Sequence, residues 1–307
     1  MAIRKKRKGL QNNRNDLIFY CIIMAWPVLQ FAVFYIGVNF NSILIAFQDI
    51  DIVTNSYSWT AKHFVNGFEK MLSPTQLTMA KNSILAYLIT ICTSIPLGLL
   101  FSYYIYKAMP GAGIFRVILF MPSIVSSIIM VSMFRFFTTD AFPAMMRDFF
   151  DITMKAPLDD KSTRFGTVMF YNIWVGFGTS VLMYSNKMST IDPAISEAAS
   201  IEGAKGFSEF WHIALPLVFP TLSIFLITGM AGLFTNQINL FSFYGVSAPE
   251  SVQTFGYWLF REAKRATKDG LAGYSELSAI GLLLTFIAVP LTLGMRMLIE
   301  KFGPSED

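Results

Sequence analysis

The most informative residue spacing lies between Glu197 and Pro216, in a polar segment set between two long apolar stretches. Glu197 is followed by Ala198 and Ala199 and, after three further residues, by Gly203. Small side chains at such positions let the backbone of another protein come close, and a Glu in the first turn of a helix complements the helix dipole. The segment therefore predicts a short docking helix, with Glu197 as the residue expected to make a charged contact with a partner protein.

Residue types also predict the ends of this helix. Ser196 is a favoured N-cap, so we expect the helix to begin at Glu197, with Pro193 in the loop before it. Gly203 is expected to end the helix, because Gly is costly inside a helix and common just after its last turn. A second segment would follow, with an apolar face made of Phe207, Phe210, Trp211 and Ile213. The docking surface is expected to contain Ser196, Glu197, Ala198, Ala199, Gly203, Ala204, Phe207, Ile213, Leu215 and Pro216.

Hydroxyl, amide and aromatic side chains occur within the apolar stretches or just beyond them, whereas charged side chains are missing from the middle of each stretch. Such groups suit a neutral, hydroxyl-rich solute such as a sugar, whereas an ion path needs charge inside the membrane. For any single residue the alternative is a hydrogen bond between helices or a ring at the membrane interface. The residues expected along a solute path are Tyr87, Tyr171, Asn172, Trp174, Thr228, Asn236, Gln237 and Asn239. Thr90, in the same stretch as Tyr87, could also contribute.

Catalytic and metal-binding chemistry finds little support in the sequence. The stretch from Thr138 to Thr163 carries five acidic residues that could bind calcium or act as acids, but their spacing matches no EF-hand, which favours a solvated external loop. Cys21 and Cys92 lie in apolar runs outside any CxxC or zinc-type spacing. The sequence holds no GxxxxGK[ST] phosphate loop, so we expect this chain to bind no cofactor and to hydrolyse no ATP.

Composition indicates that membrane helices position these residues. Apolar residues make up 54% of the 307 residues and charged residues only 14%, against about 25% in a soluble domain. A helix that crosses the roughly 30 Å of hydrocarbon needs about 20 apolar residues. We therefore predict an all-α integral membrane protein with six transmembrane helices. The six stretches are Leu17–Val38 (which could continue toward Phe47), Ser83–Tyr106, Ile114–Phe136, Phe165–Tyr184, Ala214–Phe234 and Leu277–Leu298.

The basic cluster from Arg4 to Lys8 predicts the orientation. Directly before an apolar stretch such a cluster holds the N-terminus in the cytoplasm, although in isolation it could bind nucleic acid. The apolar stretch after Asp16 is too long for a signal peptide, so residues 1–16 are predicted to be a basic cytoplasmic segment and residues 17–307 the membrane domain. Six spans return the C-terminus to the cytoplasm and place the docking loop, residues 188–213, there as well. The basic residues divide equally between the two sides, so the N-terminal cluster alone supports this orientation.

One further loop segment has a distinctive composition. Aromatic residues cluster from Thr254 to Phe260, and Arg261–Arg265 follows them with four charged residues. This pattern is typical of a short interfacial helix whose rings sit at the depth of the lipid headgroups.

The segment that begins at Glu197 resembles the EAA motif of bacterial ABC importer permeases. Its fixed positions match Glu197-Ala198-Ala199, Gly203 and, after nine intervening residues, Ile213-Ala214-Leu215-Pro216. Softer matches to the carbohydrate-uptake branch, of the maltose-transporter type, are Trp59–Leu72 leading to Asn82-Ser83, Tyr257–Ala263 and Gly273–Ala279. The resemblance implies the type I ABC importer permease fold and a non-catalytic subunit that imports a carbohydrate, driven by a separate ATPase docked on this loop.

The same resemblance implies the partners. A second homologous permease (as a heterodimer), two ATPase subunits that hold ATP and magnesium, and an extracellular or periplasmic binding protein would assemble with this chain in the bacterial cell membrane. No nucleic acid is expected. The alternatives are an ABC permease for a non-sugar solute and a stand-alone channel or carrier, for which the EAA spacing would have no purpose. The substrate site could lie in this chain or in the partner permease.

Overall fold

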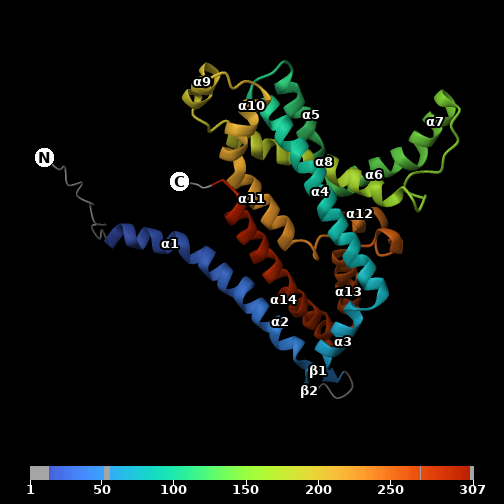
Figure 1. The fold of residues 1–307 in the computed structure, drawn as a ribbon. Helices are drawn as coiled ribbons and strands as arrows, with labels where there is room; N and C mark the ends of the chain where they lie inside the picture. Colours follow the sequence, from blue (N-terminus) through green and yellow to red (C-terminus); the bar gives the residue numbers. More distant parts are fainter. Residues whose placement is uncertain (1–13, 52–55, 270, 305–307) are drawn as a thin grey trace.

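The computed structural model describes residues 14–51, 56–269 and 271–304 (Figure 1). Within these ranges the chain is mostly helical, and six helical segments are long and apolar enough to cross a membrane. The prediction of six spans is therefore confirmed, while the basic cluster from Arg4 to Lys8 lies outside the described residues. The six segments are Leu17–Ala46, Pro74–Tyr106, Ser127–Phe150, Arg164–Met188, Phe207–Ala231 and Gly273–Phe302.

The first span continues well beyond Val38, as the sequence allowed. Its first half diverges from the other helices, whereas its last helix, α2, lies against α14 (Leu271–Phe302), the helix of the sixth span (Figure 1). The side chains from Leu17 to Phe40 are exposed in the isolated chain, as suits a helix that faces lipid or a partner. The span is built from α1 (Arg14–Gln30), a π-helical segment (Phe31–Gly37) and α2 (Val38–Ala46).

A small β-hairpin after the first span departs from the all-α prediction. It pairs β1 (Gln48–Asp51) with β2 (Ser56–Trp59) in antiparallel fashion, with the first residue of β1 opposite the last residue of β2. The helix α3 (Lys62–Met71) follows it. Hairpin and α3 lie at one end of the molecule, and α9 (Pro193–Ile201) lies at the opposite end (Figure 1).

The third span is not the single helix Ile114–Phe136 that the apolar run predicts. The predicted stretch is divided between α5 (Ala112–Ile124) and α6 (Ser127–Phe136), and the two residues between them have extended backbone conformations. The third of the six apolar segments, Ser127–Phe150, begins with α6. Pro122 lies in the last turn of α5, where it has no N–H to continue the helical hydrogen bonds. With 13 residues, α5 is only about 20 Å long and is too short to cross the membrane alone.

The external loop predicted from Thr138 to Thr163 is likewise partly wrong. The helical run continues from α6 through a π-helical segment (Phe137–Ala141) into α7 (Phe142–Phe150). Asp151 then ends the helix in a left-handed conformation (φ 56°). Figure 1 shows α7 extending away from the other helices.

The centre of the bundle is formed by α4 (Pro74–Tyr106), which crosses α8 (Arg164–Met188). The short α5 also crosses α8, and Gly178 makes this approach possible. A Cβ atom at Gly178 would lie 2.0 Å from the carbonyl oxygen of Leu119 in α5. Residues from α8 and α4 also pack with α11 (Leu215–Ala231), the main helix of the fifth span.

The aromatic patch after Thr254 is buried in the protein, so the prediction of an interfacial helix is wrong. In α13 (Phe255–Asp269), Phe255, Tyr257 and Trp258 are each at most 2% exposed. Phe255 and Trp258 pack with residues of α4 and α14. A run of aromatic residues followed by charged residues occurs both in helices on a membrane surface and in helices buried by their neighbours. The sequence pattern therefore does not distinguish the two.

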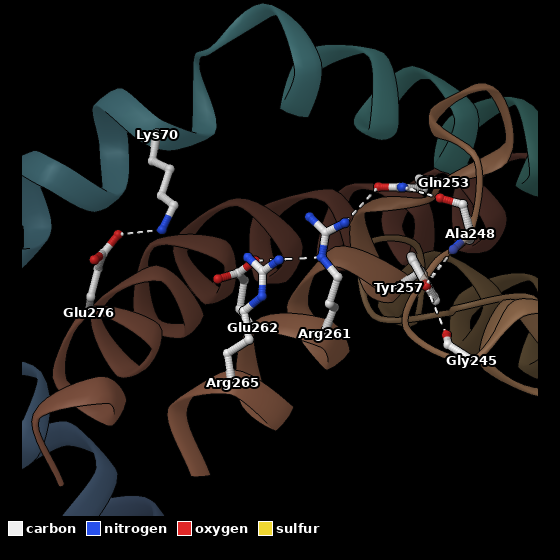
Figure 2. A network of polar contacts seen from close by, with 9 residues as sticks. All are labelled: Lys70, Gly245, Ala248, Gln253, Tyr257, Arg261, Glu262, Arg265 and Glu276. Carbon is white, nitrogen blue, oxygen red and sulfur yellow. Dashed lines mark hydrogen bonds and ion pairs between the residues drawn. The ribbon is translucent and has the colours of Figure 1, made fainter. Parts of the chain in front are cut away.

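Polar contacts hold α13 and the loop before it in place (Figure 2). The hydroxyl of Tyr257 accepts a hydrogen bond from the backbone N–H of Ala248 (3.0 Å) and donates one to the carbonyl of Gly245 (2.9 Å). The buried Gln253 donates to the Ala248 carbonyl (2.5 Å). Nearby, an ion pair of 3.0 Å between Lys70 and Glu276 joins α3 to α14.

Candidate functional site

A cavity of about 310 Å³ lies between α4, α8 and α11. Four of its polar lining residues come from α4, namely Ser83, Tyr87, Thr90 and Ser94. Their spacing of four, three and four residues places them on one face of a helix. The other polar lining residues are Ser180 and Tyr184 of α8, Thr228 of α11, and Asn236 and Thr254 from the segments that follow.

Several hydroxyl groups of this wall donate their protons to neighbouring carbonyls. Tyr87 donates to the carbonyl of Leu226 (2.8 Å), and this bond joins α4 to α11. Thr90 and Thr228 each donate to the carbonyl four residues before them, at 2.8 and 2.5 Å. A hydroxyl oxygen that has donated its proton still has lone pairs free to accept. The wall therefore offers acceptors to a solute rich in O–H groups.

None of the described residues that line the cavity carries a charge. Apolar side chains complete the wall, among them Ile91, Ile95 and Phe225. A cavity of apolar surface with a few converging polar groups is the usual form of a small-molecule site.

The structure brings together three of the eight predicted path residues, Tyr87, Thr228 and Asn236, and Thr90, named as a further contributor, lines the cavity with them. The amide of Asn172 instead donates to the carbonyls of Val168 (2.8 Å) and Ile238 (2.9 Å) and accepts a hydrogen bond from Asn239 (2.8 Å). The side-chain amides of Asn172 and Asn239 thus hydrogen-bond to each other and to the backbone. This is the alternative role stated above, a hydrogen bond between segments of the protein in place of a contact with solute.

The remaining three predicted path residues lie outside the cavity lining. Tyr171 is fully buried in an apolar cluster. Trp174 lies in a separate apolar groove with Phe134 and Phe170. Gln237 is partly buried, and its amide oxygen has no hydrogen-bond partner in the described part of the chain.

Sequence reasoning missed five polar lining residues: Ser83, Ser94, Ser180, Tyr184 and Thr254. The regular spacing of hydroxyl residues along α4 was the available signal for two of them. Nothing in the sequence indicates that α8 brings Ser180 to the same place.

The predicted docking helix is present as α9, but it begins earlier than predicted. Asp192, not Ser196, is the N-cap: its carboxylate accepts a hydrogen bond from the backbone N–H of Ala194 (2.9 Å). Pro193 occupies the first helical position, where its fixed φ suits the helix and its missing N–H is not needed. Gly203 ends the helix as predicted, with φ +91°, a conformation that glycine adopts without strain.

The surface of α9 is largely exposed and partly apolar. Glu197 and Ala198 are exposed and Ala199 is buried. Ile201 is 87% exposed, and the exposed rings of Phe207 and Trp211 stack with centroids 6.1 Å apart. We call Ile201, Phe207 and Trp211 the apolar docking patch; Ile201 was not predicted to belong to it.

The other predicted docking residues lie further inside. Ala204 and Ile213 are partly buried, as are Leu215 and Pro216 at the start of α11. Phe210, predicted on the same apolar face, is 4% exposed and packs against Tyr103 of α4. The predicted face thus divides into an exposed part and a part that anchors the segment.

Known proteins resemble the chain over nearly its whole length, although no protein-family model matches it. It is 25% identical over 301 residues to the "Probable ABC transporter permease protein YurN" of Bacillus subtilis, covering 96% of this chain and 99% of that protein. It is 23% identical over 294 residues to the "Multiple sugar-binding transport system permease protein MsmF" of Streptococcus mutans, covering 93% and 92% of the two chains. This chain is a homologue of ABC transporter permeases.

The fold of this permease homologue matches a solved ABC importer. A crystal structure of a bacterial ABC transporter "involved in the import of the acidic polysaccharide alginate" superposes with a TM-score of 0.76, at 17% identity, over 94% of this chain and 97% of the other. Six apolar helices, together with the similarity to bacterial ABC transporter permeases over more than nine tenths of the chain, make this permease homologue a multi-pass membrane protein.

Within its described residues the permease homologue has no group of three or more His, Cys, Asp or Glu residues that could bind a metal ion. Among the acidic residues between α7 and α8, Asp160 accepts hydrogen bonds from a neighbouring residue. Hydrogen bonds from the hydroxyl (2.6 Å) and backbone N–H (3.2 Å) of Ser162 lower the pKa of the exposed Asp160 carboxyl below its ordinary value.

Proposed function

We propose that this chain is a translocating subunit of an ABC importer for a neutral carbohydrate. The observation that carries the proposal is the cavity between α4, α8 and α11, whose wall combines hydroxyl and amide groups with aromatic and apolar surface. Hydroxyl-rich, uncharged solutes fit such a wall because they donate to its acceptors and bring no charge that would need a partner.

Similarity to known transporters supports a carbohydrate cargo. Relatives of the chain include MsmF, named for a multiple sugar-binding transport system, and GanP of Bacillus subtilis, named for galactooligosaccharides. The structurally similar transporter imports alginate, which is acidic. A cationic side chain would suit an acidic saccharide, and none occurs among the described lining residues. The cargo proposed here is therefore neutral.

The energy for import would come from another subunit. The sequence holds no GxxxxGK[ST] phosphate loop, so two partner ATPase subunits would bind ATP and magnesium. The docking surface is α9 with the apolar docking patch, which together offer exposed apolar side chains and the exposed Glu197 carboxylate. This end of the molecule would lie in the cytoplasm. A second homologous permease and an external binding protein would complete the transporter.

The test is purification after mild solubilisation, followed by ATPase assays with the external binding protein and a panel of neutral and acidic oligosaccharides. We expect an ATPase and a second permease to co-purify, and a neutral oligosaccharide to stimulate ATP hydrolysis. Glu197→Ala with Gly203→Asp should abolish the stimulation. Glu69→Ala, in exposed α3 at the opposite end of the molecule, is the control. A chain that purifies alone, or stimulation by acidic saccharides only, would overturn the proposal.

A further inference from the structure

Glu209 places a buried carboxylate where three segments of the chain meet. The residue is 6% exposed. Its Oε1 atom accepts a hydrogen bond from the Ser196 hydroxyl (2.5 Å) and pairs with the Lys107 ammonium, while Oε2 lies 3.1 Å from the Tyr103 hydroxyl. Lys107 also donates to the Ser196 hydroxyl (2.8 Å). We call these four residues the Glu209 network.

The Glu209 network joins α9 to α4 and to the segment that leads into α11, two of the three helices that line the cavity. Lys107 is the C-cap of α4. Glu209 ends α10 (Phe207–Glu209), which continues through a π-helical segment into α11. Ser196 lies in α9 and, in the part of the chain that the structure describes, carries the side-chain hydrogen bonds of that helix to other elements. Movement of α9 therefore acts on α4 and α11 at the same point.

A buried charge is tolerated when it is paired and fully hydrogen-bonded. Both carboxylate oxygens of Glu209 have partners. The Lys107 ammonium also lies over the rings of Tyr103 and Tyr106, 5.8 and 5.3 Å from their centroids, positions that favour a cation. Because each partner is held by the others, the network has one preferred arrangement and resists sliding of one segment past another.

Apolar packing links α9 to α4 less directly than the Glu209 network does. Phe210 packs against Tyr103 with ring centroids 5.3 Å apart, but it follows Glu209 in the chain and lies outside α9. In α9 itself, Ala199 is the one described residue that is buried.

We propose that Glu209 is a positioning residue that makes α9, α4 and the α11 segment move together. Displacement of α9 by an ATPase then shifts the two helices that carry Tyr87 and Thr228, and with them the walls of the cavity. This inference rests on the proposed function, because it needs an ATPase that moves α9.

The test compares the wild type with Lys107→Met combined with Glu209→Gln, in the complete transporter with its ATPase in lipid nanodiscs. The double variant removes both charges together, so it leaves no buried charge unpaired and is expected to fold. Arg116→Gln is the matched control, since it removes an exposed hydrogen bond of 2.8 Å between α5 and Asn186 of α8 that lies outside the network.

Hydrogen–deuterium exchange is measured with and without ATP plus orthovanadate. In the wild type and the control, trapping should change exchange both in residues 193–201 of α9 and in residues 100–109 at the end of α4. In the double variant the response of α9 should remain, and the response of α4 should fall by at least about fivefold, the lower bound of typical coupling between sites.

Three outcomes would overturn the inference. In the first, the α4 segment of the double variant responds to trapping like that of the wild type. In the second, the double variant loses its fold or no longer binds its ATPase, and this result would assign the network a structural role only. A wild-type complex whose α9 does not respond to trapping would instead refute docking of the ATPase, and the proposed function with it.

Discussion

Single glycines determine how closely neighbouring helices of the bundle approach one another. A Cβ atom at Gly178 would meet the backbone of α5, with the Leu119 carbonyl oxygen 2.0 Å away. A Cβ atom at Gly229 would meet the ring of Tyr87 at 2.8 Å. A side chain can rotate away from such a contact, whereas a backbone carbonyl moves only if its helix moves. Gly178 is therefore the more constrained of the two.

Replacement of Gly178 by Ala should separate α8 from α5. We expect a destabilisation of about 1–3 kcal/mol, typical of overpacked sites, and a lower Tm of the purified protein. The control is Gly176→Ala in the same helix, where a Cβ atom has no neighbour within 4 Å. Since Ala favours a helix over Gly by about 1 kcal/mol, this variant should be at least as stable as the wild type. Equal Tm values for the two variants would contradict the close approach of α5.

The polar residues show how far sequence can identify a site at this scale. Residue type identifies the amide and hydroxyl side chains that lie within or next to the apolar stretches as candidates for a solute path. Of these candidates, Tyr87, Thr228 and Asn236 line the cavity. Asn172 and Asn239 have the same chemistry, yet they bond to each other at 2.8 Å. Which neighbour satisfies an amide depends on the packing of distant segments, and a single sequence carries no direct information about that.

At the scale of elements, local rules predicted that a docking helix exists but placed its start incorrectly. Asp192 and Ser196 are both good caps, and the decisive residue is Pro193, whose fixed φ and missing N–H suit the first position of a helix. The break in the stretch predicted as the third span was missed for a similar reason, because the prediction did not weigh local backbone conformation. A count of apolar residues measures whether a segment is long enough to cross the membrane, and it does not register the two extended residues after α5.

Removal of the cap should loosen α9. In Asp192→Ala the backbone N–H of Ala194 loses its acceptor, at a cost of about 1 kcal/mol. Hydrogen–deuterium exchange in residues 193–201 should become faster, and docking of an ATPase should weaken with it. Asp192→Asn keeps an acceptor oxygen and should behave like the wild type. Unchanged exchange in the alanine variant would show that packing of Ala199 holds the helix without its cap.

At the scale of the whole molecule, six spans were predictable because the thickness of the membrane sets a minimum length for apolar helices. The cavity was not, because it depends on how α4, α8 and α11 approach one another. The arrangement also shows which elements share an end of the molecule: α9 lies at the same end as the last turn of α14, opposite α3 and the hairpin (Figure 1). Orientation in the membrane therefore decides whether an ATPase can reach the docking patch.

Cysteine labelling measures this orientation directly. In a background with Cys21 and Cys92, both exposed, replaced by Ser, Glu69→Cys marks α3 and Ser200→Cys marks α9, since both positions are exposed. The basic cluster at residues 4–8 predicts that α9 faces the cytoplasm. A membrane-impermeant maleimide should thus label Glu69→Cys on intact cells and Ser200→Cys only after permeabilisation. The reverse pattern would place α9 where no cytoplasmic ATPase can bind it, and the docking role of Glu197 and of the Glu209 network would be excluded together.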